Sequence, residues 1–211
     1  VTVIYSDDKG ENWTTCELDN IYNADYYYVK FFDVNNGVVI CGYAKSNDTN
    51  ESSRIYKTSN GGESWETVGS GPATNIIKGV VYVTADVGFF CYDYVDGMDS
   101  NLYKTDDGGK TFAKVILEAQ ELDSSAANSQ NQESSSKADG TSVTSESTEQ
   151  LKWNDVYKEA LVPVVDSTGI ITIYLTQGKN GVYNDGKTAA KYQSSDNGST
   201  WKYIGQMEIK D

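Results

Sequence analysis

Short apolar runs alternate with polar turns along this chain, and four of the turns share one pattern. The pattern reads [ST]-x-[DN]-x-G-x-x-[WF], and each copy stands between two strand-like runs. This arrangement predicts antiparallel strands joined by tight turns. The defining residues of the four copies are Ser6, Asp8, Gly10, Trp13; Thr58, Asn60, Gly62, Trp65; Thr105, Asp107, Gly109, Phe112; and Ser194, Asp196, Gly198, Trp201.

Each residue type in the pattern has a structural role that physical chemistry predicts. The Asp or Asn side chain can accept hydrogen bonds from backbone N–H groups of its own turn. The glycine suits a left-handed backbone conformation, which strains other residues. The Ser or Thr hydroxyl can tie the strand end to the turn, and the aromatic residue starts the next strand with a large surface to bury. The repeated turns are therefore expected to be structural.

The apolar runs around the repeated turns predict an all-β protein with strands in sets of four. We expect a half set over residues 1–18 and full sets over 19–70, 71–117 and 151–211, all within one domain. The expected strands cover residues 1–5, 14–18, 26–32, 38–43, 54–58, 65–68, 76–83, 89–94, 102–105, 112–117, 156–165, 170–175, 189–193 and 201–204.

The spacing between repeats locates one insertion. The turn glycine of the next set follows Trp13 by 24 residues and Trp65 by 23, but it follows Phe112 by 57. The excess of about 33 residues corresponds to residues 118–150, which are rich in Ser, Gln, Asn, Glu and Thr. So few large apolar residues cannot bury enough surface to order a chain, which predicts a disordered insertion. A tether is the functional alternative for this segment.

The four repeated turns resemble the Asp-box, or BNR, repeats of sialidases, sortilin-type receptors, xyloglucan-cleaving glycosidases and photosystem assembly factors. The resemblance implies a β-propeller of four-stranded antiparallel blades, with the boxes on the rim away from the functional face. About three and a half blades would be present, beginning midway through a blade. Because a propeller closes to hide its strand edges, the chain is expected to belong to a longer polypeptide or to close a ring by self-association.

Composition excludes several classes of partner. A net charge of −14 disfavours nucleic acid, because no basic patch could replace the counterions of a phosphate backbone. No apolar run approaches 18 residues and no leader stands within these residues, so neither membrane insertion nor a signal peptide is expected here.

Cysteine and histidine content bears on metals and on catalysis. Cys16, Cys41 and Cys91 lack metal-ligand spacing, and the sequence has no histidine, so no metal or other cofactor is expected. The cysteines read best as small apolar side chains, and a disulfide is left open. Without histidine, Ser–His and Cys–His nucleophile pairs are also excluded.

The sequence contains no complete catalytic site of the sialidase type. A sialidase clamps its substrate carboxylate with three arginines, whereas Arg54 is the single arginine here. A glycosidase of the xyloglucan-cleaving kind needs two carboxylates across a cleft. Acidic side chains expected opposite the boxes are Asp25, Asp93, Asp96, Asp99, Asp155 and Asp185. No catalytic residue is assigned, although blades outside this chain could complete such a site.

The binding hypothesis uses the same face. The loops at 44–53, 93–101 and 176–188 vary in length while the strands persist, which is typical of a working face. Residues 93–99 could hold calcium but lack the pattern of a dedicated loop. Aromatic side chains near this face include Tyr22, Tyr26, Tyr94, Trp153 and Tyr183. The candidate ligand face comprises Tyr26, Asp93, Tyr94, Asp96, Trp153, Asp155 and Tyr183.

These features together lead to a functional expectation. We expect an extracellular or cell-surface binding module, bacterial in origin, that recognises a glycan or a protein and uses its Asp boxes as structural turns. The alternative is a propeller-type glycoside hydrolase whose site needs further blades.

Overall fold

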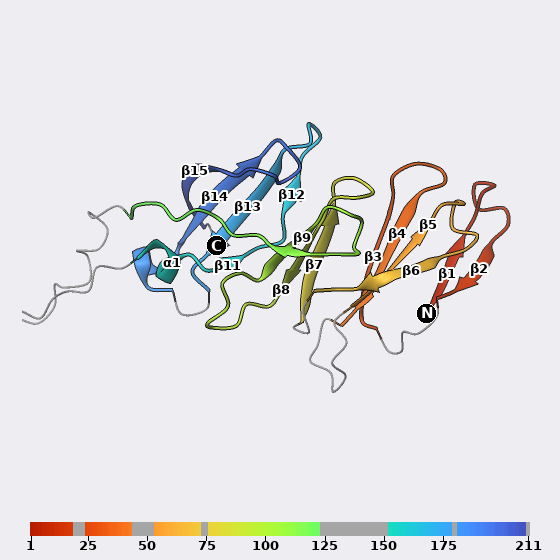
Figure 1. The fold of residues 1–211 in the computed structure, drawn as a ribbon, viewed down its shortest axis with the longest axis horizontal. Coiled ribbons are helices and arrows are strands. Elements are labelled where there is room, and N and C mark those ends of the chain that lie inside the picture. Colours follow the sequence, from red (N-terminus) through yellow and green to blue (C-terminus); the bar gives the residue numbers. More distant parts are fainter. Residues whose placement is uncertain (19–23, 44–52, 73–75, 123–151, 179–180, 210–211) are drawn as a thin grey trace, which may run out of the picture.

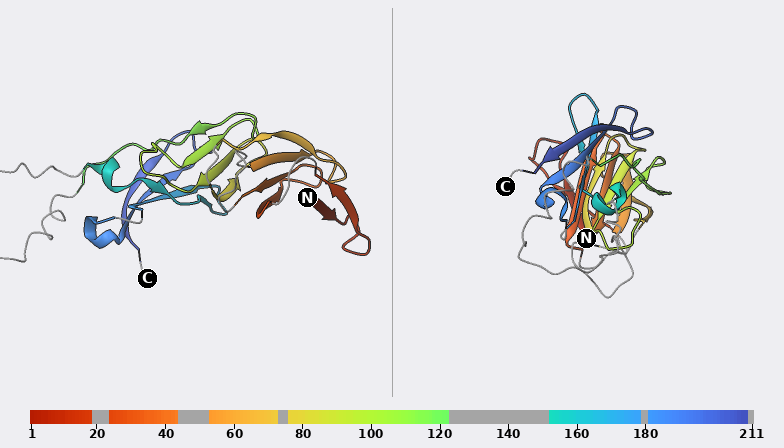
Figure 2. Two further views of the ribbon diagram at one scale, coloured as in Figure 1. Left: turned by 90° about the horizontal axis from the view of Figure 1, so that it is seen from below. Right: turned by 90° about the vertical axis from the view of Figure 1, so that its left-hand side faces the viewer.

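The computed structural model describes residues 1–18, 24–43, 53–72, 76–122, 152–178 and 181–209. Four antiparallel sheets follow one another along an arc, with the first and fourth sheets at its two ends (Figures 1 and 2). Within these ranges no sheet closes on itself, and no helix has the length and apolar character needed to cross a bilayer. The predicted insertion at 118–150 falls outside the described residues from residue 123 onward.

The first sheet has two strands, and the second and third have four each. Their bounds are β1 (Thr2–Tyr5) and β2 (Thr14–Glu17); β3 (Tyr26–Phe31), β4 (Gly37–Gly42), β5 (Ser53–Thr58) and β6 (Glu66–Ser70); and β7 (Ile77–Tyr82), β8 (Gly88–Tyr92), β9 (Leu102–Thr105) and β10 (Ala113–Lys114). In the second and third sheets the strands lie in chain order, so each sheet is an up-and-down meander. The prediction of an all-β chain with four-stranded antiparallel sheets is confirmed.

The fourth sheet departs from the prediction at its inner edge. Residues 156–165 were expected to form one strand, but they contain the end of a helical turn and two short strands. Pro163 explains the break, because proline has no backbone N–H to donate to a sheet. The elements are α1 (Trp153–Val156), β11 (Glu159–Ala160), β12 (Val164–Val165), β13 (Ile171–Thr176), the 3₁₀ turn η2 (Tyr183–Gly186), β14 (Thr188–Ser194) and β15 (Lys202–Glu208). Both short strands pair with β13.

The third sheet also has a shorter outer strand than predicted. A strand over residues 112–117 was expected, whereas β10 covers Ala113 and Lys114. The N–H of Val115 still donates to the carbonyl of Leu102 at 2.9 Å, after which the chain leaves the sheet.

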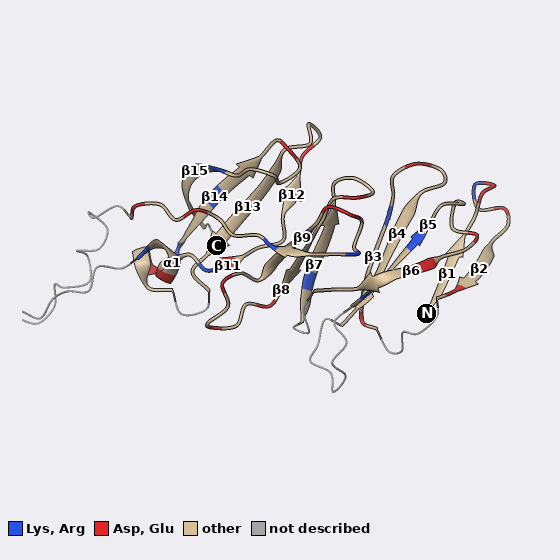
Figure 3. Ribbon diagram, in the orientation of Figure 1, with Lys and Arg blue, Asp and Glu red and all other residues tan. Residues whose placement is uncertain are grey.

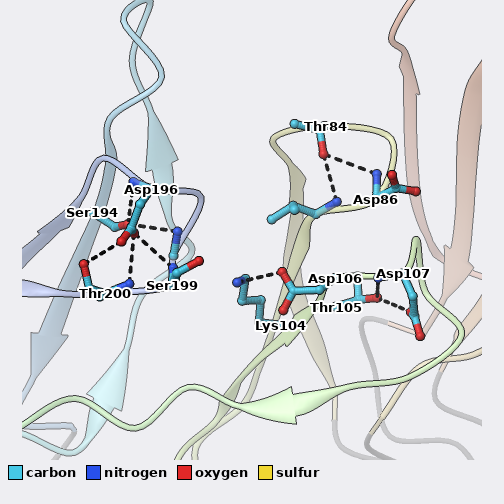
Figure 4. A network of polar contacts seen from close by, with 12 residues as sticks. Thr84, Asp86, Lys104, Thr105, Asp106, Asp107, Ser194, Asp196, Ser199 and Thr200 are labelled. Carbon is cyan, nitrogen blue, oxygen red and sulfur yellow. Dashed lines mark hydrogen bonds and ion pairs between the residues drawn. The ribbon is translucent and has the colours of Figure 1, made fainter.

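All four repeated turns have the expected hydrogen bonds. The glycine N–H donates to the Ser or Thr hydroxyl at 2.7–2.9 Å in each copy. The Asp or Asn oxygen accepts from the backbone N–H four residues later at 2.8–3.0 Å. The glycines have φ angles of +91°, +99°, +104° and +75° in chain order. Figure 4 shows Asp196 bonded to Ser199 and Thr200, and Thr105 beside Asp107.

The aromatic residue of the pattern is not buried in every copy. Trp65 packs edge-on against Phe31 of β3 with ring centroids 6.0 Å apart, and Trp201 packs in the same way on Phe89. Trp13 is 65% exposed, so the expectation of burial is wrong there. The reason is structural: in the described residues the first sheet has no inner strand like β3 to receive this ring.

The repeated turns and the inner hairpin turns lie at the same end of the sheets. In the second sheet the N–H of Gly61 donates to the carbonyl of Asn35, and in the third the N–H of Gly108 donates to the carbonyl of Asp86, both at 2.8 Å. The longer loops after β8 and β13 are at the opposite end, because these strands begin near the bonded turns and run away from them. Any site built from the loops is therefore distant from the repeated turns.

The core lies between successive sheets. Side chains of β4 and β5 meet those of β7 and β8 in one cluster, and side chains of β8 meet those of β13 in the next. Gly79 in β7 allows close approach of the fourth sheet, because a Cβ atom there would lie 2.6 Å from Cγ2 of Val162. The sheets are thus tightly stacked along the arc.

Candidate ligand-binding site

Two adjoining cavities lie between the third and fourth sheets, at the end opposite the repeated turns. The first has a volume of about 290 Å³ and the second about 600 Å³, and Tyr94 and Lys158 line both. These volumes are close to or within the range of small-molecule sites in proteins. The first cavity is lined by Asp93, Tyr94, Asp96, Asp155, Val156, Lys158, Glu159, Gln177, Gly178, Gly181, Val182 and Tyr183.

The loop that follows β8 forms one wall of the first cavity. Asp93 is fixed by two contacts: its N–H donates to the carbonyl of Ile76 at 2.8 Å, and its carboxylate lies 2.6 Å from Nζ of Lys78. The Asp93 contact raises the pKa of Lys78. Tyr94 is half-buried, so part of its ring remains open to the cavity side of the loop.

The segment from α1 to β11 forms the second wall. Asp155 is exposed on the single turn of α1, and Lys158 and Glu159 follow where the chain enters the fourth sheet. The N–H of Lys158 donates to the carbonyl of Thr176 at 3.0 Å, which anchors this entry to the end of β13. Carboxylates from two different sheets therefore face the same cavity.

A buried amide holds the third wall. Gln177 is 5% exposed; its Nε2 donates to the carbonyl of Tyr183 at 2.7 Å, and its Oε1 accepts from the N–H of Tyr183 at 3.0 Å. Nε2 also donates to Oγ1 of Thr188 at 3.0 Å, and that hydroxyl contacts the Tyr157 hydroxyl at 2.8 Å. Gly181 is required beside it, because a Cβ atom there would lie 2.3 Å from Cβ of Gln177.

The electrostatic character of the first cavity is acidic. Asp93, Asp96, Asp155 and Glu159 line it together with one cation, Lys158. Figure 3 shows the acidic positions in the loop after β8 and in α1. Burial, and secondarily the charge of Asp96, raises the pKa of Tyr94, so this phenol stays neutral and can donate a hydrogen bond. Hydroxyl and ammonium groups suit such a site, whereas anions are repelled.

Metal binding has no support in the part of the chain that the structure describes. There, His, Cys, Asp and Glu side chains do not form a group of three that could hold an ion. The three cysteines are free thiols, and burial raises the pKa of Cys41 to about 11 and that of Cys91 to about 12.

The structure brings most of the predicted ligand-face residues together. Five of the seven line the first cavity, namely Asp93, Tyr94, Asp96, Asp155 and Tyr183. Asp99 lines the second cavity, where its carboxylate lies 3.0 Å from Nζ of Lys114. Asp25 and Asp185 line neither cavity, and Tyr22 lies outside the described residues.

Three predicted aromatic platforms have their rings or hydroxyls engaged by other parts of the protein. Trp153 is 4% exposed and packs against Tyr157 at a centroid distance of 4.6 Å, so it cannot stack on a ligand. Tyr183 is 3% exposed and packs against the same Tyr157 ring at 6.2 Å. Tyr26 accepts a hydrogen bond from the N–H of Val80 at 2.8 Å and so faces the third sheet. These placements correct the prediction of a broad aromatic face.

Sequence reasoning missed Lys158, Glu159 and Gln177. Gln177 lies in the loop 176–188, which its variable length had already assigned to the working face. A single glutamine in a sequence does not indicate that its amide will be buried and hydrogen-bonded. Lys158 and Glu159 were assigned to the interior of a continuous strand, which concealed their position at the cavity.

Comparison with known proteins adds no identification. No protein-family model matches the chain, and no curated protein matches it either.

Proposed function

We propose that this chain is part of a β-propeller with Asp-box turns and acts as an extracellular or cell-surface binding module for a glycan. The cavity between the third and fourth sheets carries the proposal, because it combines a volume of about 290 Å³, hydroxyl-binding carboxylates and a partly exposed tyrosine. The propeller assignment is supported by successive four-stranded meanders stacked along an arc and by the Asp-box hydrogen bonds. The extracellular location is supported by the resemblance to Asp-box proteins.

The chemistry of the lining favours a neutral or amino sugar. Carboxylates accept hydrogen bonds from sugar hydroxyls, and a charged acceptor makes these bonds stronger than neutral ones. The ring of Tyr94 offers an apolar surface beside the carboxylates of Asp93 and Asp96. Acidic sugars are disfavoured, because the four carboxylates of the lining outnumber the two lysines beside them, Lys158 in the lining and Lys78 paired with Asp93. A protein ligand is less well suited to an enclosed cavity of this size than to a broad surface.

Glycoside hydrolysis is the second candidate, and the position of the carboxylates supports it. Asp93 and Asp96 come from the loop after β8, whereas Asp155 lies on α1 and Glu159 in β11, and all four line one cavity. An acid and a base on opposite walls are what glycosidases use, at separations of roughly 5–10 Å. Turnover of aryl glycosides, lost in Asp155→Asn or Glu159→Gln, would favour this candidate.

A glycan array probed with the purified chain tests the binding proposal. We expect signal on neutral or amino-sugar glycans and none on sialylated ones. The signal should depend on Tyr94, which lines both cavities. Absence of signal on every glycan, with the chain folded, would overturn the proposal.

A further inference from the structure

One face of the inner strand β3 exposes three large apolar side chains. Tyr27, Val29 and Phe31 are 54%, 57% and 42% exposed. They occupy alternate positions along the strand and therefore point to one side of the sheet. On the other side, Tyr26 and Tyr28 contact the third sheet through hydrogen bonds. The exposed side is the one that faces the first sheet, because Val39 and Cys41 of β4 pack with Val3 of β1.

The same positions are covered in the third sheet. Phe31 pairs with Gly37 and Tyr82 pairs with Gly88 at corresponding ends of the inner hairpins, so Phe31 corresponds to Tyr82. Two residues earlier, Val29 corresponds to Val80. Val80 and Tyr82 are 4% and 1% exposed, because β3 lies over them. The difference between the two sheets therefore shows that no described strand covers β3 on the side of the first sheet.

Among the described residues, the first sheet has two strands fewer than the second and third sheets. The second and third sheets have four strands each, whereas the first sheet has β1 and β2 among the described residues. These two strands cover Val39, Cys41 and Tyr56, all at most 2% exposed, and leave β3 uncovered. β1 corresponds to β5, since both lead into a repeated turn, and β5 pairs with β4 on its inner side. In the described residues β1 pairs with β2 alone.

We propose that the exposed face of β3 and the inner edge of β1 form a docking site for a β-hairpin of the β3–β4 type. Its second strand would pair with β1, and its first would lie over Val29 and Phe31. The interface between the second and third sheets indicates the side chains that this hairpin needs. There, the hydroxyl of Tyr26 in β3 accepts a hydrogen bond from the N–H of Val80 in β7. The hairpin should likewise carry hydroxyl groups that accept hydrogen bonds from N–H groups of β3. This is recognition by strand addition, with side-chain contacts supplying specificity.

A second copy of the chain fits the gap less well than a hairpin does. The complete sheets of the chain are at least four strands wide, whereas the space beside β3 and β1 takes two strands. The docking site also continues an interface already present, because its apolar residues extend the cluster of Val39, Cys41 and Tyr56.

A chain extended by a copy of its own hairpin tests the proposal. Ser6 corresponds to Thr58, so Val1 corresponds to Ser53, and a copy of residues 24–52 placed directly before Val1 supplies the hairpin in register. We expect amide hydrogen exchange at Val29 and Phe31 to slow by roughly ten-fold or more relative to the unextended chain, because covered strands open only with the sheet. The thermal unfolding midpoint should rise as well.

Two substitutions provide the control. Val29→Lys in the extended chain places a charge in the proposed interface and should abolish the protection. Val34→Lys, at an 85% exposed position in the β3–β4 turn, should leave it intact. Unchanged exchange at Val29 in the extended chain would overturn the proposal. So would sedimentation showing that the unextended chain dimerises through this face and becomes monomeric with Val29→Lys, since the occupant would then be a second copy.

Discussion

The phenol oxygen of Tyr28 accepts a hydrogen bond from the backbone N–H of Tyr82 at 3.1 Å, which joins the second sheet to the third. Tyr26 makes the same bond to the N–H of Val80 at 2.8 Å, and Nζ of Lys30 donates to the carbonyl of Tyr82. Three alternate side chains of β3 therefore satisfy the inner edge of β7. The rings of Tyr28 and Tyr82 also stack, with an interplanar angle of 26°.

Replacing Tyr28 by Phe should destabilise the fold. The substitution keeps the ring but leaves the N–H of the buried Tyr82 without its acceptor, which costs about 1–3 kcal/mol. Chemical denaturation at neutral pH measures the loss in the free energy of unfolding. Tyr27→Phe is the matched control, because that hydroxyl bonds the carbonyl of Ala24 in an exposed setting where water can replace it. Equal losses in both variants would contradict this account of the interface.

Asn101 should have a similar role between the third and fourth sheets. It is 1% exposed, donates to the carbonyls of Tyr92 and Ala160 at 2.7 and 2.9 Å, and accepts from the N–H of Ala160 at 2.8 Å. Asn101→Asp keeps the size of the side chain but replaces its NH₂ group by an oxygen. That oxygen would face the carbonyls of Tyr92 and Ala160 without a hydrogen to donate. We expect a loss of at least about 1–3 kcal/mol in the free energy of unfolding, the cost of an unsatisfied buried group. A loss of only a few tenths would refute this role.

High pH should unfold the protein through its buried tyrosines. Burial raises the pKa of Tyr82, Tyr26 and Tyr28 above the usual value near 10, and that of Tyr192 to about 12. A raised pKa means that the stabilisation is complete below the unfolded value and is lost as the pH rises above about 10. Tyrosinate absorbance should therefore rise first as the exposed tyrosines ionise. Tyr82, Tyr26, Tyr28 and Tyr192 should ionise only at the pH at which secondary structure is lost. A gradual titration of all tyrosines without unfolding would contradict this prediction.

Low pH should destabilise the protein by protonating the aspartates of the repeated turns. Hydrogen bonds from Asn12 lower the pKa of Asp8 to about 2, and bonds from Thr111 and Thr200 lower those of Asp107 and Asp196. A lowered pKa means that the stabilisation is present above about 4 and is lost as the pH falls towards 2. The unfolding midpoint should thus decrease steeply across this range.

The repeated turn with Asn60 suggests a substitution that isolates the effect of aspartate protonation on stability. Its Asn60 accepts from the N–H of Ser64 at 3.0 Å, so an amide can replace the carboxylate as acceptor. Asp107→Asn should fold at neutral pH and show a smaller decrease in unfolding midpoint between pH 4 and 2. Asp106→Asn changes the neighbouring carboxylate, which is 66% exposed and pairs with Lys104 instead of bonding the turn, and it should behave like the parent chain below pH 4. Identical acid sensitivity of Asp107→Asn and the parent would contradict the assignment.

The repeated turns could be predicted from sequence because their bonds are local. Each joins residues at most four positions apart, as in the bond from the N–H of Gly109 to the hydroxyl of Thr105. The strands could be predicted as well, because each repeated turn fixes where one strand ends and the next begins. The structure therefore agrees with the sequence at the four repeated turns, whose hydrogen bonds are short in range.

The orientation of aromatic side chains could not be predicted in the same way. Whether Tyr26 faced a ligand or another sheet depends on β7, 54 residues away. Trp153 was assigned to a loop surface, but it packs against Tyr157 at the end of its own helical turn and against Tyr203 of the distant β15. Trp13 matches the repeated pattern and is nevertheless exposed, because its partner surface is not on its own hairpin. Such contacts are set by distant strands, and local patterns carry no information on them.

Tyr94 and Trp153 should respond in opposite ways to truncation. Tyr94 is half-buried and lines both cavities, so Tyr94→Ala should weaken glycan binding by roughly ten-fold, since losing one aromatic contact costs on the order of 1–2 kcal/mol. Its unfolding midpoint should change little. Trp153→Ala removes a core side chain and should cost about 3–5 kcal/mol of stability, as large-to-small core substitutions do.

A charge substitution completes this test of the site. Asp96→Asn keeps the shape of an exposed cavity residue and removes one of its four carboxylates, so it should weaken binding of an amino sugar more than of a neutral one. Asp7→Asn, exposed at the box end, is the matched control and should bind as the parent does. Binding of both ligands by titration calorimetry separates these outcomes. If Asp7→Asn and Asp96→Asn weaken binding equally, net charge governs binding, and the cavity is not the site.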